Sequence, residues 1–159
     1  MSKRREGREA AIQFLYQQDI HRDRTTDLRA DFWAFREAKA SVREYAENLI
    51  AGVNTNLADV DARIVKTVEN FGIERLAAVD RNILRLAIYE MFHCMETPPV
   101  VAINEAIEIA RKFGGEDSSR FVNGVLDKIK GELTRPLRDA VVPRNQGSGV
   151  RGQESEPAT

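Results

Sequence analysis

The stretch from Val101 to Ile129 constrains the fold more than any other part of the sequence. Apolar residues in its first half recur at the spacing that places them on one face of a helix: Ile103, Ala106, Ile107 and Ala110. Gly114 and Gly115 then predict a stop, because glycine readily takes the positive φ that ends many helices. A second helix is expected to follow, capped by Asp117 or Ser118.

Apolar residues at helical spacing also fill most of the preceding chain. Helices are expected over about residues 2–20, 28–40 and 42–68, the last with a bend or break at 54–56 and a cap at Ser41. A helix from Arg81 to Met95, capped by Asp80, is apolar nearly all round and should be buried. No segment alternates convincingly with the period of a strand, so we predict an all-α single domain of about six or seven helices.

Composition limits the classes of protein that remain. A net charge of −1 means that any nucleic-acid site must come from local clustering of Lys and Arg. The single cysteine, Cys94, excludes an internal disulfide, and no apolar run approaches the roughly 20 residues of a membrane span. We expect a soluble cytoplasmic protein, folded over residues 1–135, with a disordered Pro- and Gly-containing tail at 136–159.

The sequence offers little support for an enzyme. Two histidines and one cysteine are too few for a closed zinc site, and neither a metal nor another cofactor is expected. Cys94 has no evident activating base and is expected to be a buried, inert thiol, and Trp33 is likewise expected in the core. Glu105 and Glu108 share a helix face, where we interpret them as solubilising rather than catalytic.

Three surface features are candidates for binding. The first helical turn carries four cations, Lys3, Arg4, Arg5 and Arg8, although cations there oppose the helix macrodipole. This cluster is either a solvated, frayed terminus or a phosphate-binding arm. Phe121, beside Arg120, lies at the rim of an apolar stripe, as expected of an aromatic that stacks on unpaired bases. The third feature is the helix face that carries Tyr16.

Several sequence blocks resemble one family. They are DRNILRLAIYE at residues 80–90, PVVAINEA at 99–106, Phe113-Gly114, and FVNGVL at 121–126. Together with the Arg-rich start, they resemble the NusB family of bacterial transcription antitermination factors over about residues 3–133. The resemblance implies two packed helical halves and a heterodimer with NusE, a small-subunit ribosomal protein. It also implies binding of single-stranded boxA RNA in ribosomal RNA leaders, and action with other Nus factors on RNA polymerase.

The resemblance also assigns residues to these roles. On this chain the RNA-facing set is Arg4, Arg5, Arg8 and Phe121, with Lys3 and Arg120 as neighbours and Asp117 at the edge. The NusE-facing set is Tyr16 and Asp80. Two alternatives stay open: a homodimeric helical scaffold that binds no RNA, and a domain of the kind fused to RNA cytosine methyltransferases. No α/β cofactor domain follows Arg135, which argues against methylation by this chain.

Overall fold

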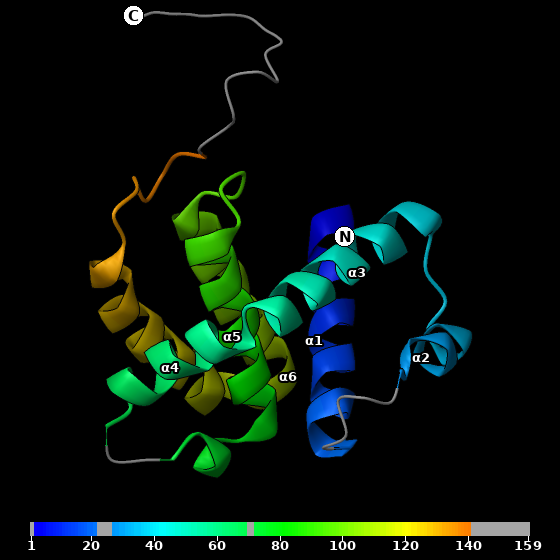
Figure 1. The fold of residues 1–159 in the computed structure, drawn as a ribbon, viewed down its shortest axis with the longest axis horizontal. Coiled ribbons are helices and arrows are strands. Elements are labelled where there is room, and N and C mark those ends of the chain that lie inside the picture. The colour runs from blue at the N-terminus through cyan, green and yellow to red at the C-terminus, as the bar shows by residue number, and fades with distance from the viewer. Residues whose placement is uncertain (1, 22–26, 70–71, 141–159) are drawn as a thin grey trace, which may run out of the picture.

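A computed structural model describes residues 2–21, 27–69 and 72–140 (Figure 1). Within these ranges the chain forms six α-helices and two short 3₁₀ helices, η1 and η2, and no β-strand. The elements are α1 (Lys3–His21), α2 (Arg29–Phe35), α3 (Ala40–Thr55), α4 (Leu57–Thr67), η1 (Ile73–Arg75), α5 (Ala78–His93), α6 (Pro99–Ile129) and η2 (Lys130–Glu132). The predicted all-α class is confirmed.

The helices form two halves that share one core. Figure 1 shows α1, α2 and α3 on one side and α4, α5 and α6 on the other, with α3 crossing α1 before the chain enters α4. Buried side chains of both halves belong to a single apolar cluster that includes Leu15 of α1, Ile50 of α3 and Ile88 of α5. The burial of α5 follows from its sequence, since a helix that is apolar nearly all round must pack on several sides. Trp33 is 7% exposed and belongs to the same core, as predicted.

The long apolar run of residues 42–68 breaks where the asparagines predict. α3 ends at Thr55 and α4 begins at Leu57, with Asn56 between them outside the helical region at φ −105° and ψ 17°. The Asn56 side-chain Nδ2 donates a hydrogen bond to the carbonyl of Gly52 at 2.8 Å. The same carbonyl also accepts the Asn56 backbone N–H at 3.1 Å, so the side chain adds a second hydrogen bond where α3 ends.

Three expected helix boundaries are wrong. The second helix covers Arg29–Phe35 rather than residues 28–40. α3 begins at Ala40, before the expected cap at Ser41, and α5 begins at Ala78, before the expected cap at Asp80. The Arg81 N–H donates to the Ala77 carbonyl at 2.9 Å, which places Asp80 inside the first turn. A carboxylate there still favours the helix, because it faces the positive end of the macrodipole.

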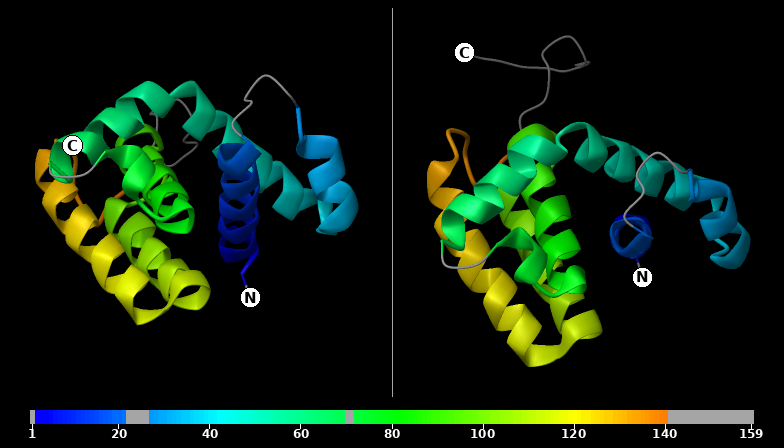
Figure 2. Two further views of the ribbon diagram at one scale, coloured as in Figure 1. Left: turned by 90° about the horizontal axis from the view of Figure 1, so that it is seen from below. Right: turned by 60° about the horizontal axis from the view of Figure 1, so that its bottom comes forward.

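A glycine bends α6 into two segments. α6 extends from Pro99 to Ile129, but Gly115 within it has the non-helical angles φ 84° and ψ −169°, a conformation open almost only to glycine. Figure 2 shows the resulting change of direction, which makes a first segment before Gly115 and a second segment after it. The predicted Gly-Gly interruption is therefore confirmed.

The part of the C-terminal tail that the structure describes is held against α6. Residues 136–140 of the expected tail are described, and the Leu137 carbonyl accepts a hydrogen bond from Val100 N–H at 2.9 Å. The rest of that tail, 141–159, lies outside the described residues. Among the helices that are described, none has the length and apolar character needed to cross a membrane.

Candidate functional site

The first turn of α1 divides its cations into two kinds. Lys3 and Arg4 are exposed to solvent, whereas Arg5 and Arg8 point back to the C-terminal half and form ion pairs. The Arg5 guanidinium donates to both carboxylate oxygens of Glu105, at 2.5 and 2.6 Å. These hydrogen bonds lower the pKa of the Glu105 carboxyl below its ordinary value. Glu105 is thus an interhelical partner of Arg5, and its interpretation as a solubilising residue is wrong.

Arg8 is buried, and its guanidinium is therefore not accessible to a ligand at the surface. Its Nε and Nη2 donate to the two carboxylate oxygens of Glu90 in α5, both at 2.9 Å. The side chains of Arg8 and Glu90 are only 4% and 1% exposed. A phosphate could contact this guanidinium only if the buried pair opened, whereas Lys3 and Arg4 are available as they stand.

A second site lies where α4 ends against the second segment of α6. The Phe121 ring lines an open groove of about 370 Å³, which we call the Phe121 groove. Its lining residues are Thr67, Val68, Glu69, Arg120, Phe121, Gly124, Val125 and Lys128. Phe121 is partly buried against the core, in agreement with its predicted place at the rim of the apolar stripe.

The sequence neighbours of Phe121 contribute charge at the same end of α6. Arg120 Nη2 donates to Asp117 Oδ1 at 2.6 Å, and both side chains are largely exposed. Reasoning from the sequence missed the residues from α4 and did not single out Lys128, since only the fold brings residues 67–69 beside residue 121.

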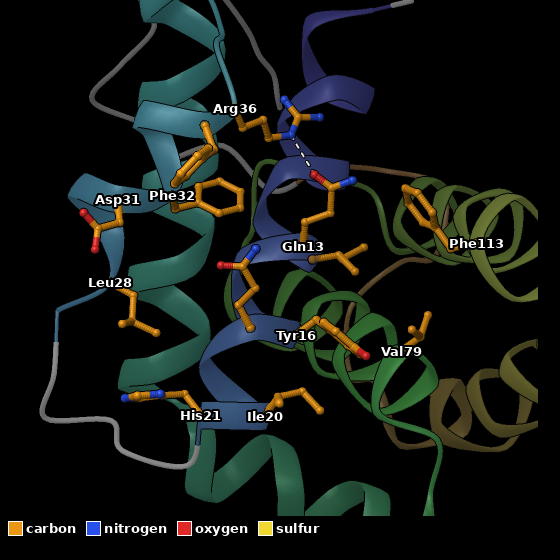
Figure 3. Close-up of a pocket in the computed structure, with 13 residues that line it drawn as sticks. Gln13, Tyr16, Ile20, His21, Leu28, Asp31, Phe32, Arg36, Val79 and Phe113 are labelled. Atoms are coloured by element: carbon orange, nitrogen blue, oxygen red, sulfur yellow. Dashed lines mark hydrogen bonds between the residues drawn. The ribbon is translucent and has the colours of Figure 1, made fainter.

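A groove larger than the Phe121 groove surrounds Tyr16. It has a volume of about 880 Å³ and runs between α1, α2, the start of α5 and the end of the first segment of α6; we call it the Tyr16 groove. Figure 3 shows Tyr16 beside Val79, with Phe113 above them on the same side and Leu28 and Phe32 on the opposite wall. Across its upper part, Arg36 Nε donates to Gln13 Oε1 at 2.7 Å (Figure 3). Much of the lining is exposed and apolar, as expected of a surface that binds another protein.

Tyr16 and Asp80 have different environments. Tyr16 is 38% exposed and lines the groove, whereas Asp80 is 9% exposed and lies beside it, next to Val79. The Asp80 Oδ1 atom is buried without a hydrogen-bond partner. It would lie 3.7 Å from a Cβ added at Gly114, so Asp80 packs against the bend of α6.

The nine predicted residues therefore lie on three surfaces rather than on one. The first turn of α1 packs on the first segment of α6 through Arg5 and Glu105, whereas Phe121 is on the second segment. Tyr16 lies along α1 from Arg5, and the Tyr16 groove shares no lining residue with the Phe121 groove. A ligand that contacts both cationic regions must therefore extend along α6.

Neither Cys94 nor His93 forms a catalytic or metal site in the part of the chain that the structure describes. Cys94 is 8% exposed, as predicted, and burial raises the pKa of its thiol to about 11, so it stays protonated at neutral pH. His93 Nε2 lies 2.8 Å from Asp59 Oδ2. Within residues 2–21, 27–69 and 72–140, no three His, Cys, Asp or Glu side chains are grouped as a metal site requires.

The sequence of this chain is similar to sequences of one known family. The family model described as the NusB family matches residues 5–130. The transcription antitermination protein NusB of Geotalea uraniireducens is 45% identical over 137 residues, covering 81% of this chain and 94% of the relative. The NusB of Desulfotalea psychrophila is 46% identical over 136 residues, with 82% and 96% covered.

Solved structures give the same result. T. maritima NusB superposes with a TM-score of 0.74 at 36% identity, over 85% of this chain and 95% of that one. A structure of antitermination factors NusB and NusE in complex with dsRNA gives a TM-score of 0.75 at 27% identity, with 84% and 99% covered. The sequence match, the shared fold and the names of the relatives agree, and this chain belongs to the NusB family of transcription antitermination proteins.

Proposed function

We propose that this protein binds RNA together with a NusE-type ribosomal protein in the cytoplasm, as a non-enzymatic subunit of an antitermination complex. The RNA is a single-stranded boxA element of ribosomal RNA operon transcripts. Bound there with other Nus factors, the complex helps RNA polymerase to read through terminators. Residues 1–135 carry these contacts, and none is assigned to residues 136–159.

The observation that carries the RNA role is the place of Phe121. Its ring lines a groove whose polar residues include two cations, Arg120 and Lys128. Single-stranded RNA is commonly held by aromatic rings that stack on bases and by cations that neutralise phosphates. The relationship to a NusB that was solved with NusE and RNA supports the same role.

The first turn of α1 supplies the second set of phosphate contacts in this proposal. Lys3 and Arg4 are solvent-exposed, and the Arg5 side chain is 34% exposed at the edge of its pair with Glu105. A phosphate can therefore compete with Glu105 for Arg5. Arg8 has the weakest geometry for direct contact, and its pair with Glu90 gives it a role in holding α1 in position.

The Tyr16 groove is the proposed contact surface for the NusE-type partner. Its exposed apolar residues include Tyr16, Ile20, Phe35 and Phe113, at 38%, 57%, 93% and 37% exposure. Burying such residues in a heterodimer removes apolar area from water. Asp80 would act there mainly by positioning Val79 and the bend of α6, because it is itself largely buried.

The same exposed groove supports a second candidate, a homodimer in which another copy covers Tyr16 and Phe35 and no RNA is bound. Sizing the protein alone and with its NusE partner separates the two. A heterodimer that forms at the expense of any homodimer supports the leading proposal, and a homodimer that excludes NusE supports the alternative.

A fluorescence titration tests the RNA role directly. The protein, alone and with NusE, is titrated with boxA-like single-stranded RNA, a scrambled strand of the same composition and the corresponding duplex. The proposal expects the tightest binding for boxA-like single-stranded RNA in the presence of NusE. Equal affinity for the scrambled strand would overturn the proposed specificity, and a preference for the duplex would overturn the single-stranded assignment.

A further inference from the structure

The Phe121 groove has two unlike walls. On one side the second segment of α6 presents Phe121, Gly124 and Val125, and on the other the end of α4 presents Thr67, Val68 and Glu69. Val68 and Val125 are 9% and 6% exposed, so the groove lies on the apolar core. Its volume of about 370 Å³ is near the small end of the range for ligand pockets, about 300–1,000 Å³. A cleft of this size beside one aromatic ring suits a single flat base rather than a helix.

Two cations bracket this cleft. Arg120, Gly124 and Lys128 follow one another at four-residue intervals along α6, so they share one face, with the glycine between the cations. Arg120 is held by Asp117 in an exposed ion pair, which a phosphate can replace at little cost. A nucleotide whose base enters beside Gly124 thus has a cation available on either side for its flanking phosphates.

The polar groups of the α4 wall limit which base fits. The Thr67 hydroxyl donates its hydrogen to the Arg63 carbonyl at 2.9 Å, which leaves only its lone pairs for a ligand. The Glu69 carboxylate likewise accepts hydrogen bonds only. A base that pairs with this wall must therefore present donors.

We propose that the Phe121 groove is a pocket for one unstacked nucleobase and that it prefers guanine. Guanine presents two adjacent donors, N1–H and the N2 amino group, which match the two oxygens of one carboxylate. Uracil places carbonyl oxygens on both sides of its single N–H, and they would face Glu69 unfavourably. This inference rests on the proposed RNA function and adds a base-reading residue, Glu69, together with Thr67, Val68 and Lys128.

Filling the pocket tests its existence. An added Cβ at Gly124 meets no atom within 4 Å, so Gly124→Leu fits the fold while its side chain occupies the cleft. Gly131→Leu is the matched control, since its Cβ also meets nothing within 4 Å and it does not line the groove. Loss of a stacked base lowers affinity by about fivefold or more. We expect that loss for boxA-like RNA with Gly124→Leu in the NusE complex, and wild-type binding with Gly131→Leu.

Replacing guanines one at a time with inosine, which lacks the N2 amino group, tests base identity. Inosine at one of these positions should weaken RNA binding to the wild-type protein severalfold, and Glu69→Gln should remove most of that difference.

If wild-type protein binds boxA-like RNA but Gly124→Leu binds equally well, the pocket is overturned and the RNA function stands. If Gly124→Leu weakens binding but no inosine position matters, the guanine preference is overturned. If wild-type protein does not distinguish boxA-like from scrambled RNA, the function fails, and the pocket with it.

Discussion

At the scale of residues, similar cationic side chains near the start of α1 have different tasks. Lys3 and Arg4 face solvent, Arg5 is bound to Glu105 at the surface, and Arg8 is buried on Glu90. The sequence shows four equivalent cations, but the acids that distinguish them come from α5 and α6, more than 80 positions away. Roles at this scale are therefore best tested one side chain at a time.

Replacing Phe121 with alanine should weaken RNA binding by about 1–3 kcal/mol, the usual contribution of a base stacked on an aromatic ring. The measurement is a titration of boxA-like RNA in the NusE complex. Leu137→Ala is the control for loss of an exposed apolar side chain, because Leu137 is 39% exposed and lines neither the Phe121 groove nor the Tyr16 groove. Unchanged affinity for Phe121→Ala would contradict the stacking role.

Replacing Arg5 with alanine should reduce the salt dependence of RNA binding. Each lost phosphate contact lowers the slope of log affinity against log salt by about 0.7 for a single strand. The control is Arg29→Ala on α2: Arg29 forms an exposed ion pair with Asp27, and its loss should leave the slope unchanged. Titrations at several salt concentrations make the comparison, and parallel slopes for Arg5→Ala and wild type would refute a phosphate contact by Arg5.

At the scale of elements, the position of α1 decides where the cations can act. Several ion pairs join this helix to the C-terminal half, among them Arg5 with Glu105, Arg8 with Glu90, and Glu9 with Lys112 at 3.0 Å. The pair of Arg8 with Glu90 is the most buried of them, so it makes the docking of α1 most sensitive to a single change. The bend at Gly115 divides α6 in the same way: Glu105 and Lys112, which pair with α1, lie on the first segment, and Phe121 lies on the second.

Replacing Arg8 with alanine should destabilise the fold by about 3–5 kcal/mol, because it leaves the Glu90 carboxylate buried without its bidentate partner. Urea denaturation followed by circular dichroism measures the loss. The double variant Arg8→Met/Glu90→Leu removes both charges and should recover most of the stability. If the single and double variants prove equally stable, the pair is not what holds α1 in place.

At the scale of the whole molecule, the two halves meet through one apolar core and a rim of charge. Asp19 of α1 accepts hydrogen bonds from Arg81 at 2.7 Å and from Asn82 at 3.0 Å, both in α5. Burial alone would raise the pKa of Asp19, but these hydrogen bonds outweigh it and hold the pKa below its ordinary value. Asp19 and Glu105 thus lie at the same boundary between the two halves, and both carboxyl groups have a pKa below the ordinary value.

Acid should loosen this boundary. A carboxyl whose folded pKa is depressed contributes stability above its unfolded pKa and loses it as pH falls through the folded value. The ordinary pKa values are 4.5 for Glu105 and 3.8 for Asp19, so the free energy of unfolding should fall progressively below them. Urea titrations between neutral pH and about pH 3 measure the decline. Glu105→Gln should show a shallower acid decline, and an unchanged pH profile would contradict the role of its ion pair.

Much of the fold could be predicted from local patterns. The bend at Gly115, the break at Asn56 and the burial of α5 each follow from residues adjacent in sequence, and all three are confirmed. Helix starts were less predictable. Caps were expected at Ser41 and Asp80, but α3 begins one residue earlier at Ala40 and α5 two residues earlier at Ala78. Alanine has the highest intrinsic helix propensity, so it extends a helix towards its N-terminus where a cap residue would otherwise begin it.

The sequence by itself determined the helical class, the family and a first set of cationic and aromatic side chains that are candidates for binding. These depend on periodicity and residue type, which are local properties of the chain. Only the tertiary structure decided that Arg8 is buried on Glu90, that Glu105 holds Arg5, and that α4 completes the Phe121 groove. The physical reason is that burial and charge pairing depend on distances in space, and residues 5 and 105, or 67 and 121, become neighbours only when the helices pack.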